Sequence, residues 1–246
     1  MEEKDKFSWE YCPEKYPIDT SKNPLPIFYD FYDLSKDFQN VYEPAEDSFL
    51  LIDSLDKELE QIKFDKNKKI TSIEIGGGSG LVSCCYLSKL KQLNIYILNH
   101  YCVDLNKDAV NLTHNLLKNY KLDNNVNCIE GDLLNKFDKN KIFDIIIFNP
   151  PYVTTSDEEY ERALKEKDIY AAWAGGKKGS ETINRFVNEL KGHINETSII
   201  FLLLSKENDY QTIIDNMKKL YEMNCEILMR KQFKNERLSV MKFSKT

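Results

Sequence analysis

The chain has 246 residues, of which 41% are hydrophobic and 30% charged, and its formal net charge at pH 7 is −6. These values are typical of a globular enzyme with a full hydrophobic core, and no apolar run reaches the roughly 18 residues that a membrane-spanning helix needs. The net negative charge argues against nucleic acid as the main substrate, and six cysteines without a C-x-x-C pair argue against a disulfide framework.

The first 40 residues differ from the rest. They carry prolines among many aromatic side chains and no apolar segment like that of a signal peptide. We expect residues 1–40 to form an N-terminal arm of undefined role and residues 41–246 to form a single domain. Reduced cysteines favour a cytoplasmic location, with the nucleus as a second compartment.

After residue 41, helical and strand patterns alternate. Residues 44–62 have an apolar stripe with helical spacing and carry Pro44 near the first turn, where proline is tolerated. Strands separated by helices predict a mostly parallel α/β sheet, and a short last connection predicts an antiparallel hairpin. Further helices are expected at 81–90, 107–118, 180–191 and 208–220, and strands at 70–75, 94–103, 125–130, 143–148, 198–204, 225–231 and 238–243.

The apolar run 143–148 stops abruptly at Asn149-Pro150-Pro151-Tyr152. Both prolines lack an N–H and have a fixed φ, so the backbone must leave the sheet rigidly at this point. In α/β proteins, ligands bind at the carboxyl ends of parallel strands. The motif is therefore the first candidate for a functional site.

A second candidate is the glycine-rich turn 74–80, which follows the first strand and reads E-I-G-G-G-S-G. Glycines there let a ligand approach the backbone closely. The spacing differs from the dinucleotide G-x-G-x-x-G, and no Gly-Lys-Ser/Thr follows, which excludes a triphosphate-binding loop. A tight turn that binds nothing is the alternative interpretation.

Acidic side chains follow the next two strands. Asp104 could accept hydrogen bonds from both ribose hydroxyls of an adenosine, and Asp132 from an adenine amino group, although each could instead cap a helix. With Glu74, they place an acid at three successive strand ends beside the glycine turn. A cofactor with an adenosine, a cationic centre and an amino acid tail fits this arrangement, and S-adenosylmethionine is such a cofactor.

These motifs together resemble the class I S-adenosylmethionine-dependent methyltransferases, and within them the HemK family, which methylates the glutamine amide of peptide-chain release factors. The resemblance covers residues 41–246 and indicates the eukaryotic and archaeal branch. It implies a Rossmann-like three-layer sandwich with a seven-stranded sheet. It rests on EPAEDS at 43–48, E-x-G-x-G-x-G at 74–80, D-x-N at 104–106, GDL at 131–133, NPPYV at 149–153 and AAWAGG-x-x-G at 171–179.

The resemblance also implies which residues bind the cofactor. Ser48 and Glu74 lie near its methionine end in the family, Asp104 at the ribose, and Asp132 with Leu133 around the adenine. For Ser48, an acidic first helical turn favoured by the helix dipole is the alternative. The full expected set is Ser48, Glu74, Gly76, Gly78, Gly80, Asp104, Asp132, Leu133 and Asn149.

The chemistry of a planar NH₂ group explains the residue types at 149–152. Its nitrogen is a poor nucleophile because the lone pair is delocalised, so it must be held and aimed. The Asn149 side-chain oxygen and the Pro150 carbonyl can accept its two N–H groups, with Pro151 stiffening the loop and Tyr152 stacking on the substrate. These acceptors stabilise the positive charge that builds up on the nitrogen. The four residues are the expected catalytic set.

The motif defines the nitrogen but not the molecule that carries it. The favoured substrate is the glutamine of the Gly-Gly-Gln loop in the eukaryotic-type release factor. The alternatives are N6-adenine methylation of DNA or RNA, disfavoured by the net acidity and the lack of a domain that extracts a base, and a non-catalytic binding module. By resemblance, a small zinc-ribbon activator protein is expected as a heterodimer partner on the edge strand 125–130.

Other features have plainer interpretations. His100, His114 and His193 have no ligand spacing, so we expect no metal site, and surface or capping roles for the histidines. The charged run 157–168 is a solvated helix or loop, or a cover over the substrate. Trp173 positions that cover or packs in the core.

Overall fold

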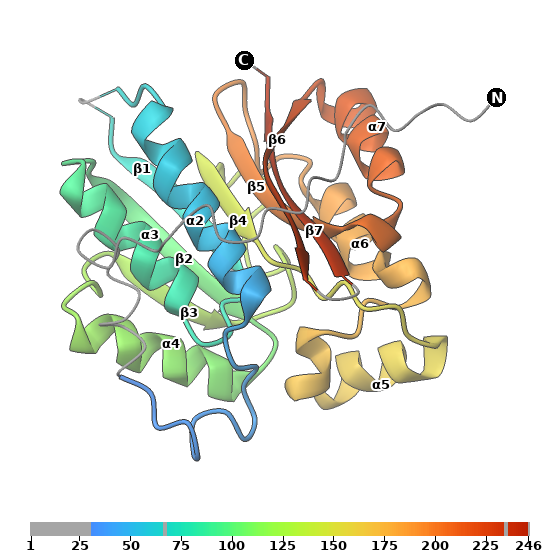
Figure 1. Ribbon diagram of the computed structural model, residues 1–246. Helices are drawn as coiled ribbons and strands as arrows, with labels where there is room; N and C mark the ends of the chain where they lie inside the picture. The colour runs from blue at the N-terminus through green and yellow to red at the C-terminus, as the bar shows by residue number, and fades with distance from the viewer. Residues whose placement is uncertain (1–30, 66–67, 234–235, 246) are drawn as a thin grey trace.

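The strands form one seven-stranded sheet (Figure 1). The structure is a computed structural model that describes residues 31–65, 68–233 and 236–245. The strand order across the sheet is β3-β2-β1-β4-β5-β7-β6. The strands are β1 (Ile70–Ile75), β2 (Ile97–Asp104), β3 (Val126–Glu130), β4 (Ile145–Phe148), β5 (Ile199–Ser205), β6 (Asn224–Phe233) and β7 (Glu236–Ser244).

The strand directions follow the predicted pattern. β1 runs parallel to β2 and β4, β2 to β3, and β4 to β5, whereas β7 is antiparallel to both β5 and β6. This confirms the mostly parallel sheet with an antiparallel C-terminal hairpin. The chain places β2 and β3 on one side of β1, and β4 and β5 on the other, so the strand order reverses between β1 and β4. Such a switch point leaves a crevice at the carboxyl ends of the strands.

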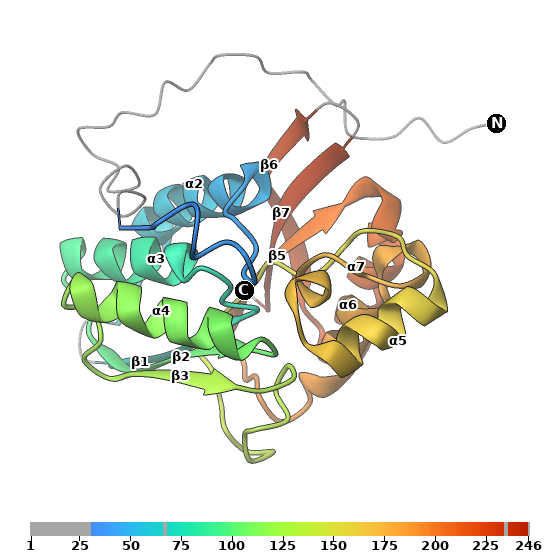
Figure 2. The ribbon, with the colours of Figure 1, turned by 90° about the horizontal axis from the view of Figure 1, so that it is seen from below.

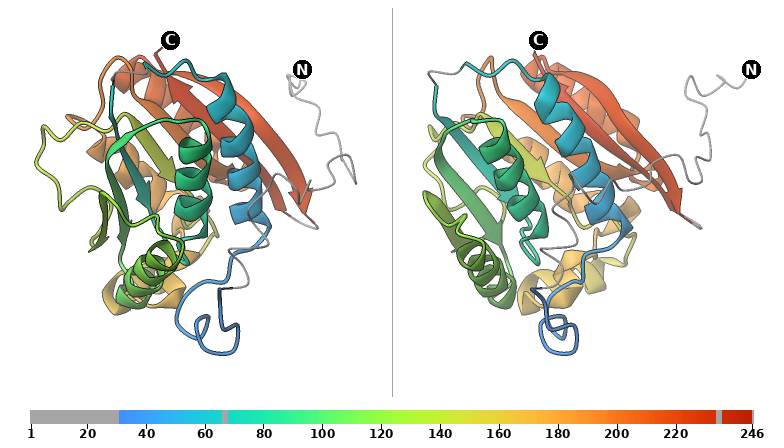
Figure 3. Two further views of the ribbon diagram at one scale, coloured as in Figure 1. Left: turned by 90° about the vertical axis from the view of Figure 1, so that its left-hand side faces the viewer. Right: turned by 60° about the vertical axis from the view of Figure 1, so that its left-hand side comes forward.

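Helices cover both faces of the sheet (Figures 2 and 3). The helices are α2 (Glu46–Gln61), α3 (Leu81–Gln92), α4 (Lys107–Asn119), α5 (Asp157–Glu166), α6 (Glu181–Glu189) and α7 (Tyr210–Tyr221), with short 3₁₀ turns η1 (Ile169–Ala172), η2 (Lys177–Gly179) and η3 (Lys206–Asn208). Helices α2, α3 and α4 share a hydrophobic cluster with Ile145 and Ile147, whereas α6 and α7 pack with Ile146 and Phe148. Alternate residues of one strand thus serve opposite layers, which confirms the three-layer sandwich. None of the helices in the described ranges is long and apolar enough to cross a membrane.

Burial along the sheet agrees with the apolar runs in the sequence. Every residue of β1 and β4 is buried, as expected for central parallel strands covered on both faces. In β3, no residue is fully buried, and β2 is its one neighbour in the sheet. The prediction that residues 125–130 form an edge strand is therefore confirmed.

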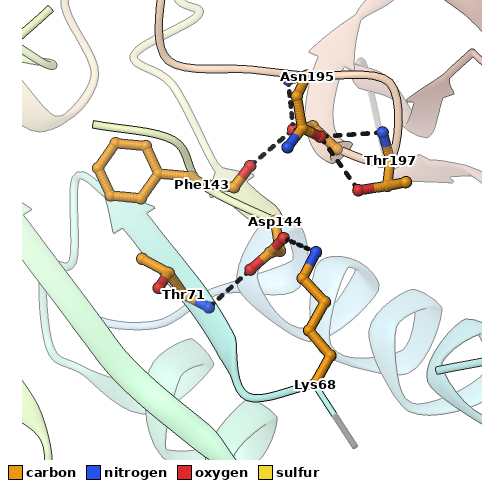
Figure 4. Close-up of polar contacts among 7 residues, drawn as sticks. Lys68, Thr71, Phe143, Asp144, Asn195 and Thr197 are labelled. Carbon is orange, nitrogen blue, oxygen red and sulfur yellow. Dashed lines mark hydrogen bonds and ion pairs between the residues drawn. The ribbon is translucent and has the colours of Figure 1, made fainter. Parts of the chain in front are cut away.

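Strand β4 begins two residues later than the sequence predicts, because Phe143 and Asp144 make a junction of their own (Figure 4). The Asp144 carboxylate accepts a hydrogen bond from the Thr71 backbone N–H at 2.9 Å and forms an ion pair with Lys68. The Asp144 N–H donates to the Thr71 carbonyl at 2.7 Å. The single charge in the predicted strand thus joins the amino ends of β1 and β4.

Residues 31–43 lie against the domain rather than apart from it. Tyr32 is buried in the core, and its hydroxyl donates to the carbonyl of Ser79 in the glycine turn at 3.1 Å. The Asn40 carbonyl accepts from the Asn106 side chain at 2.6 Å. Two residues of the assigned arm, Tyr32 and Asn40, therefore bond to the turns after β1 and β2. The rest of the predicted arm, residues 1–30, lies outside the described residues.

The remaining differences from the predicted elements are small and local. The charged run 157–168 forms α5, which begins at a capping box between Ser156 and Glu159. Strand β2 begins at Ile97 instead of Asn94, because Asn94 has a left-handed φ of 55°.

Gly80 provides a test of how tightly α3 and α4 pack. Its φ is +84°, and an added Cβ would lie 2.8 Å from the Thr113 Cα in α4. Gly80→Ala should therefore lower the free energy of unfolding by about 2 kcal/mol or more, from backbone strain and steric overlap. Gly77→Ala is the matched control, because its Cβ would meet its nearest neighbours at 3.6 Å. Urea denaturation of both variants measures the difference, and equal losses would contradict this account.

Candidate active site

A cavity opens at the carboxyl ends of the strands. This is the place where the strand order reverses and where the sequence predicts ligand binding. Its lining includes residues 74–79 from the end of β1, 103–106 from β2, 131–133 after β3, and Phe148, Asn149 and Pro151 from β4.

The structure brings most of the predicted site residues together in this cavity. Eight of the nine expected cofactor positions line it: Ser48, Glu74, Gly76, Gly78, Asp104, Asp132, Leu133 and Asn149. Gly80 does not line it, because its backbone packs against Thr113 instead. Pro150 and Tyr152 also lie outside the lining, although both adjoin residues that belong to it.

The Asp104 carboxylate joins the turns after β1 and β2. One oxygen accepts from the Gly78 N–H at 2.9 Å, and the other accepts from the Asn106 N–H at 2.8 Å. Burial raises the pKa of Asp104 despite these donors. Asn106, not Asp104, caps α4 through the Asp108 N–H. The alternative of Asp104 as a helix cap is therefore excluded, and its carboxylate is held at the cavity wall.

Glu74 is a buried carboxyl group at the cavity wall. Burial raises its pKa to about 8, although the Ser83 hydroxyl donates a hydrogen bond to it. The Ser83 oxygen also lies 2.8 Å from His100 Nε2, and His100 Nδ1 lies 2.8 Å from the Ser72 hydroxyl. Because Ser83 has a single hydroxyl hydrogen, a bond to Glu74 requires Nε2–H of His100 to donate to Ser83. Glu74 thus belongs to a buried hydrogen-bond network with Ser83, His100 and Ser72.

Two of the three histidines are not where the sequence analysis expected them. His100 and His193 are buried, so the expectation of a surface position is wrong for both. Burial lowers the pKa of His100 to about 3, which keeps its imidazole neutral in the core. Glu74, His100 and Cys102 have ligand-type atoms within 4.8 Å of one another, and the Ser83 hydroxyl lies in hydrogen-bonding contact with all three.

Asp132 has a partner that the sequence analysis did not identify. Arg185 of α6 forms an ion pair with its carboxylate, and both side chains are partly buried. No regular helix begins at Asp132, so a capping role is excluded. No motif in the sequence marked Arg185, which lies 53 residues along the chain from Asp132.

Asn149 has one amide atom paired and the other unpaired. Its Nδ2 donates to the Asp47 carboxylate at 3.0 Å. Its Oδ1 is buried and has no hydrogen-bond partner among the described residues. A buried acceptor without a donor is costly unless a ligand supplies one. The atom that the sequence assigns to the substrate NH₂ is thus available at the cavity wall.

A second asparagine holds the loop that follows. Asn208 is buried, and its Nδ2 donates to the Tyr152 carbonyl at 2.9 Å and to the Gly179 carbonyl at 3.0 Å. Gly179 lies so close to the Tyr152 carbonyl that no Cβ would fit between them. The Tyr152 hydroxyl donates to Glu236 at 3.4 Å. The Asn208 side chain therefore holds the loop at Tyr152 and the glycine-rich turn at 175–179 together. No motif in the sequence marked Asn208.

Helix α5 and η1 close one side of the cavity. Their contribution to the lining consists mainly of small and apolar side chains: Ala163, Leu164, Ile169, Ala171 and Ala172. Trp173 is half-buried and packs edge-on against Tyr170 of η1 at 5.6 Å between ring centroids. The charged run 157–168 thus has a solvated face and also forms part of the cavity wall.

Comparisons with known proteins show which proteins this chain is similar to. Residues 46–167 match the family described as "Methyltransferase small domain". Methyltransferase HEMK2 of Mus musculus is 33% identical over 212 residues, which cover 85% of this chain and 92% of the mouse protein. The putative protein N5-glutamine methyltransferase MJ0928 of Methanocaldococcus jannaschii is 35% identical over 205 residues, or 82% of this chain and 90% of the archaeal protein.

A solved structure has the same fold. The Mtq2-Trm112 complex of E. cuniculi, described as responsible for methylation of the translation termination factor eRF1, aligns with a TM-score of 0.55 and 22% identity. The alignment covers 84% of this chain and 99% of that one. The sequence identities extend over nearly the whole length of the mouse and archaeal relatives. This chain therefore belongs to the HemK family of methyltransferases, in the branch that contains its eukaryotic and archaeal members.

Proposed function

We propose that this enzyme transfers a methyl group from S-adenosylmethionine to the side-chain amide nitrogen of a glutamine in the eukaryotic-type peptide-chain release factor. The observation that carries the proposal is the buried, unpaired Oδ1 of Asn149 beside the glycine turn. The named activities of the relatives, on a protein glutamine and on eRF1, supply the substrate class. A release factor acts with the ribosome, so we propose that the enzyme works in the cytoplasm.

The cavity fits the proposed cofactor. An added Cβ at Gly78 would meet no atom closer than 3.9 Å, so the backbone there is open to a ligand. Asp104 offers carboxylate oxygens to a ribose, and Asp132 with Leu133 frames the far end for an adenine. Asp47, Glu74 and Asp104 place three acids around the cavity, which favours a cationic ligand. S-adenosylmethionine supplies the electrophilic methyl group when bound.

The substrate amide is held by the residues after β4. Asn149 Oδ1 and the Pro150 carbonyl accept its two N–H groups, and the prolines fix their direction. Gly76 lies directly against the Asn149 backbone, with 3.7 Å between its hypothetical Cβ and the Asn149 carbonyl oxygen. The cofactor turn and the substrate acceptors are therefore neighbours. Both acceptors stabilise the positive charge on the nitrogen, which then releases its proton.

We propose a heterodimer with a small zinc-ribbon activator protein on the free edge of β3. The supporting observations are the outer side of this strand, which pairs with no other strand of the described residues, and the partner named with the E. cuniculi enzyme. Strand addition to such an edge satisfies its free backbone groups. Residues 41–246 are proposed to form the catalytic domain. Residues 31–40 are proposed to pack against the turns after β1 and β2, which bind the cofactor.

A transfer assay with radiolabelled cofactor tests the substrate. We expect label on recombinant release factor and none on duplex or single-stranded oligonucleotides, with more label when the zinc-ribbon protein is co-expressed. Release factor with its Gly-Gly-Gln glutamine changed to alanine is the control and should take none. Label confined to oligonucleotide would contradict the proposed substrate. Full activity of the enzyme without the zinc-ribbon protein would contradict the proposed need for an activator.

Two substitutions separate the acceptor from the cofactor site. Asn149→Ala should abolish transfer, by about 100-fold or more, while the affinity for cofactor is largely kept. Asp104→Ala should mainly weaken cofactor binding, because it removes the carboxylate that joins the two turns. Calorimetric affinities together with single-turnover rates measure both effects. Near wild-type turnover in Asn149→Ala would disprove the acceptor role.

Glu74 should make cofactor binding depend on pH. Its pKa of about 8 means that at pH 7 most molecules without ligand carry it protonated. A cationic ligand favours the carboxylate, so binding at pH 7 should release a proton and affinity should rise from about pH 6 to 8, by at most tenfold per unit. Calorimetry in two buffers with different ionisation enthalpies measures the release. Glu74→Gln is the control, and an unchanged pH slope in it would contradict the assignment.

A further inference from the structure

Asp47 meets Asn149 at the cavity wall from a distant part of the sequence. It lies in the first turn of α2, 102 residues before Asn149, and its side chain is buried. One carboxylate oxygen accepts from the Asn149 Nδ2 at 3.0 Å. The other accepts from the Ser48 backbone N–H at 2.7 Å. Both oxygens of Asp47 thus accept hydrogen bonds, one from α2 and one from Asn149.

This pairing determines which end of the Asn149 amide faces the substrate. The oxygen and the NH₂ of a carboxamide have nearly the same shape, so packing alone scarcely distinguishes the two orientations. A carboxylate accepts hydrogen bonds and does not donate them. It therefore draws the NH₂ of Asn149 toward α2 and leaves Oδ1 toward the cavity, where it is unpaired among the described residues.

Resting on the proposed function, we propose that Asp47 is the positioning residue that makes Asn149 an acceptor for the substrate NH₂. The position of Asp47 supports a negative charge, because the N-terminal turn of a helix stabilises a carboxylate. A charged acceptor on one side of an amide also polarises its oxygen on the other side. Asp47 thereby orients Oδ1 and strengthens it toward a nitrogen that becomes positive during methyl transfer.

Asp47→Asn is the diagnostic substitution. An asparagine at 47 has one acceptor oxygen, whereas Asp47 accepts from the Ser48 N–H, the Ser48 hydroxyl and the Asn149 NH₂. If its oxygen stays with Ser48, its NH₂ faces residue 149 and turns the Asn149 amide over, so that an NH₂ points at the substrate. We expect kcat to fall about 100-fold, with the dissociation constant for cofactor changed less than about twofold.

Glu46→Gln is the matched control for the loss of charge. Glu46 occupies the same helical turn but is exposed. The substitution removes the same charge from the same helix terminus without touching Asn149. Its kcat should stay within about twofold of wild type, because surface changes of this kind have small effects. Equal losses in the two variants would show a general charge effect and overturn the positioning role.

Exchanging the pair provides a rescue. In Asp47→Asn with Asn149→Asp, the residue 47 amide can accept from Ser48 and donate to residue 149, whose second oxygen then faces the cavity as an acceptor. We expect kcat at least about tenfold above that of Asp47→Asn alone, since the acceptor is restored. A double variant no faster than Asp47→Asn would contradict the proposal.

A measurement without turnover separates this proposal from the substrate assignment. The side-chain NH₂ resonance of Asn149, identified by its loss in Asn149→Ala, should exchange slowly with water in wild type and faster in Asp47→Asn. Unchanged exchange in Asp47→Asn would overturn the positioning role. If the release factor takes no label yet the exchange changes as expected, the proposed substrate fails and the role of Asp47 stands.

Discussion

The register between β1 and β4 determines where this enzyme can perform its chemistry. Ile75 pairs with Phe148, so the next residues, Gly76 and Asn149, leave the sheet side by side. A glycine at 76 permits this approach, and the two prolines after Asn149 prevent the strand from pairing further. A shift of one residue would send alternate side chains to the wrong face and would separate the glycine turn from Asn149. Every other feature of the site depends on this juxtaposition.

Around that point, the fold assembles an excess of negative charge. Among the described residues, Asp47, Glu74 and Asp104 line the cavity without forming an ion pair, whereas Asp132 is paired with Arg185. Burying acids in this way costs free energy, which appears as the raised pKa values of Glu74 and Asp104. A cationic ligand at one end of the cavity recovers part of that cost. The cavity wall therefore differs in charge between its parts: the acids at 47, 74 and 104 form no ion pair, whereas Asp132 is paired with Arg185.

The sequence alone predicts the strands, the layers and the ends at which ligands bind, because these follow from local periodicity and from residues adjacent in the chain. It does not predict Asp47 with Asn149, Arg185 with Asp132, or Asn208 with Tyr152, since each pair joins elements that only tertiary packing brings together. The burial of His100 was missed for the same reason: its partners Ser72 and Ser83 come from a neighbouring strand and a covering helix. Motifs thus identify the groups that touch a ligand more readily than the groups that hold them.

In the proposed reaction, the acceptors after β4 recognise the reacting NH₂ group, and other parts of the cavity recognise the rest of the molecule. A pair of fixed acceptors selects a planar NH₂ by its two coplanar N–H groups, whether it belongs to an amide or to an aromatic ring. In the proposed reaction, discrimination between such molecules would depend on other parts of the cavity wall, among them α5 and η1. Their small and apolar side chains line the cavity, and Tyr170 and Val153 are exposed. In the proposed reaction, the strand ends would define the chemistry, and the segment that follows them would contribute to the choice of substrate.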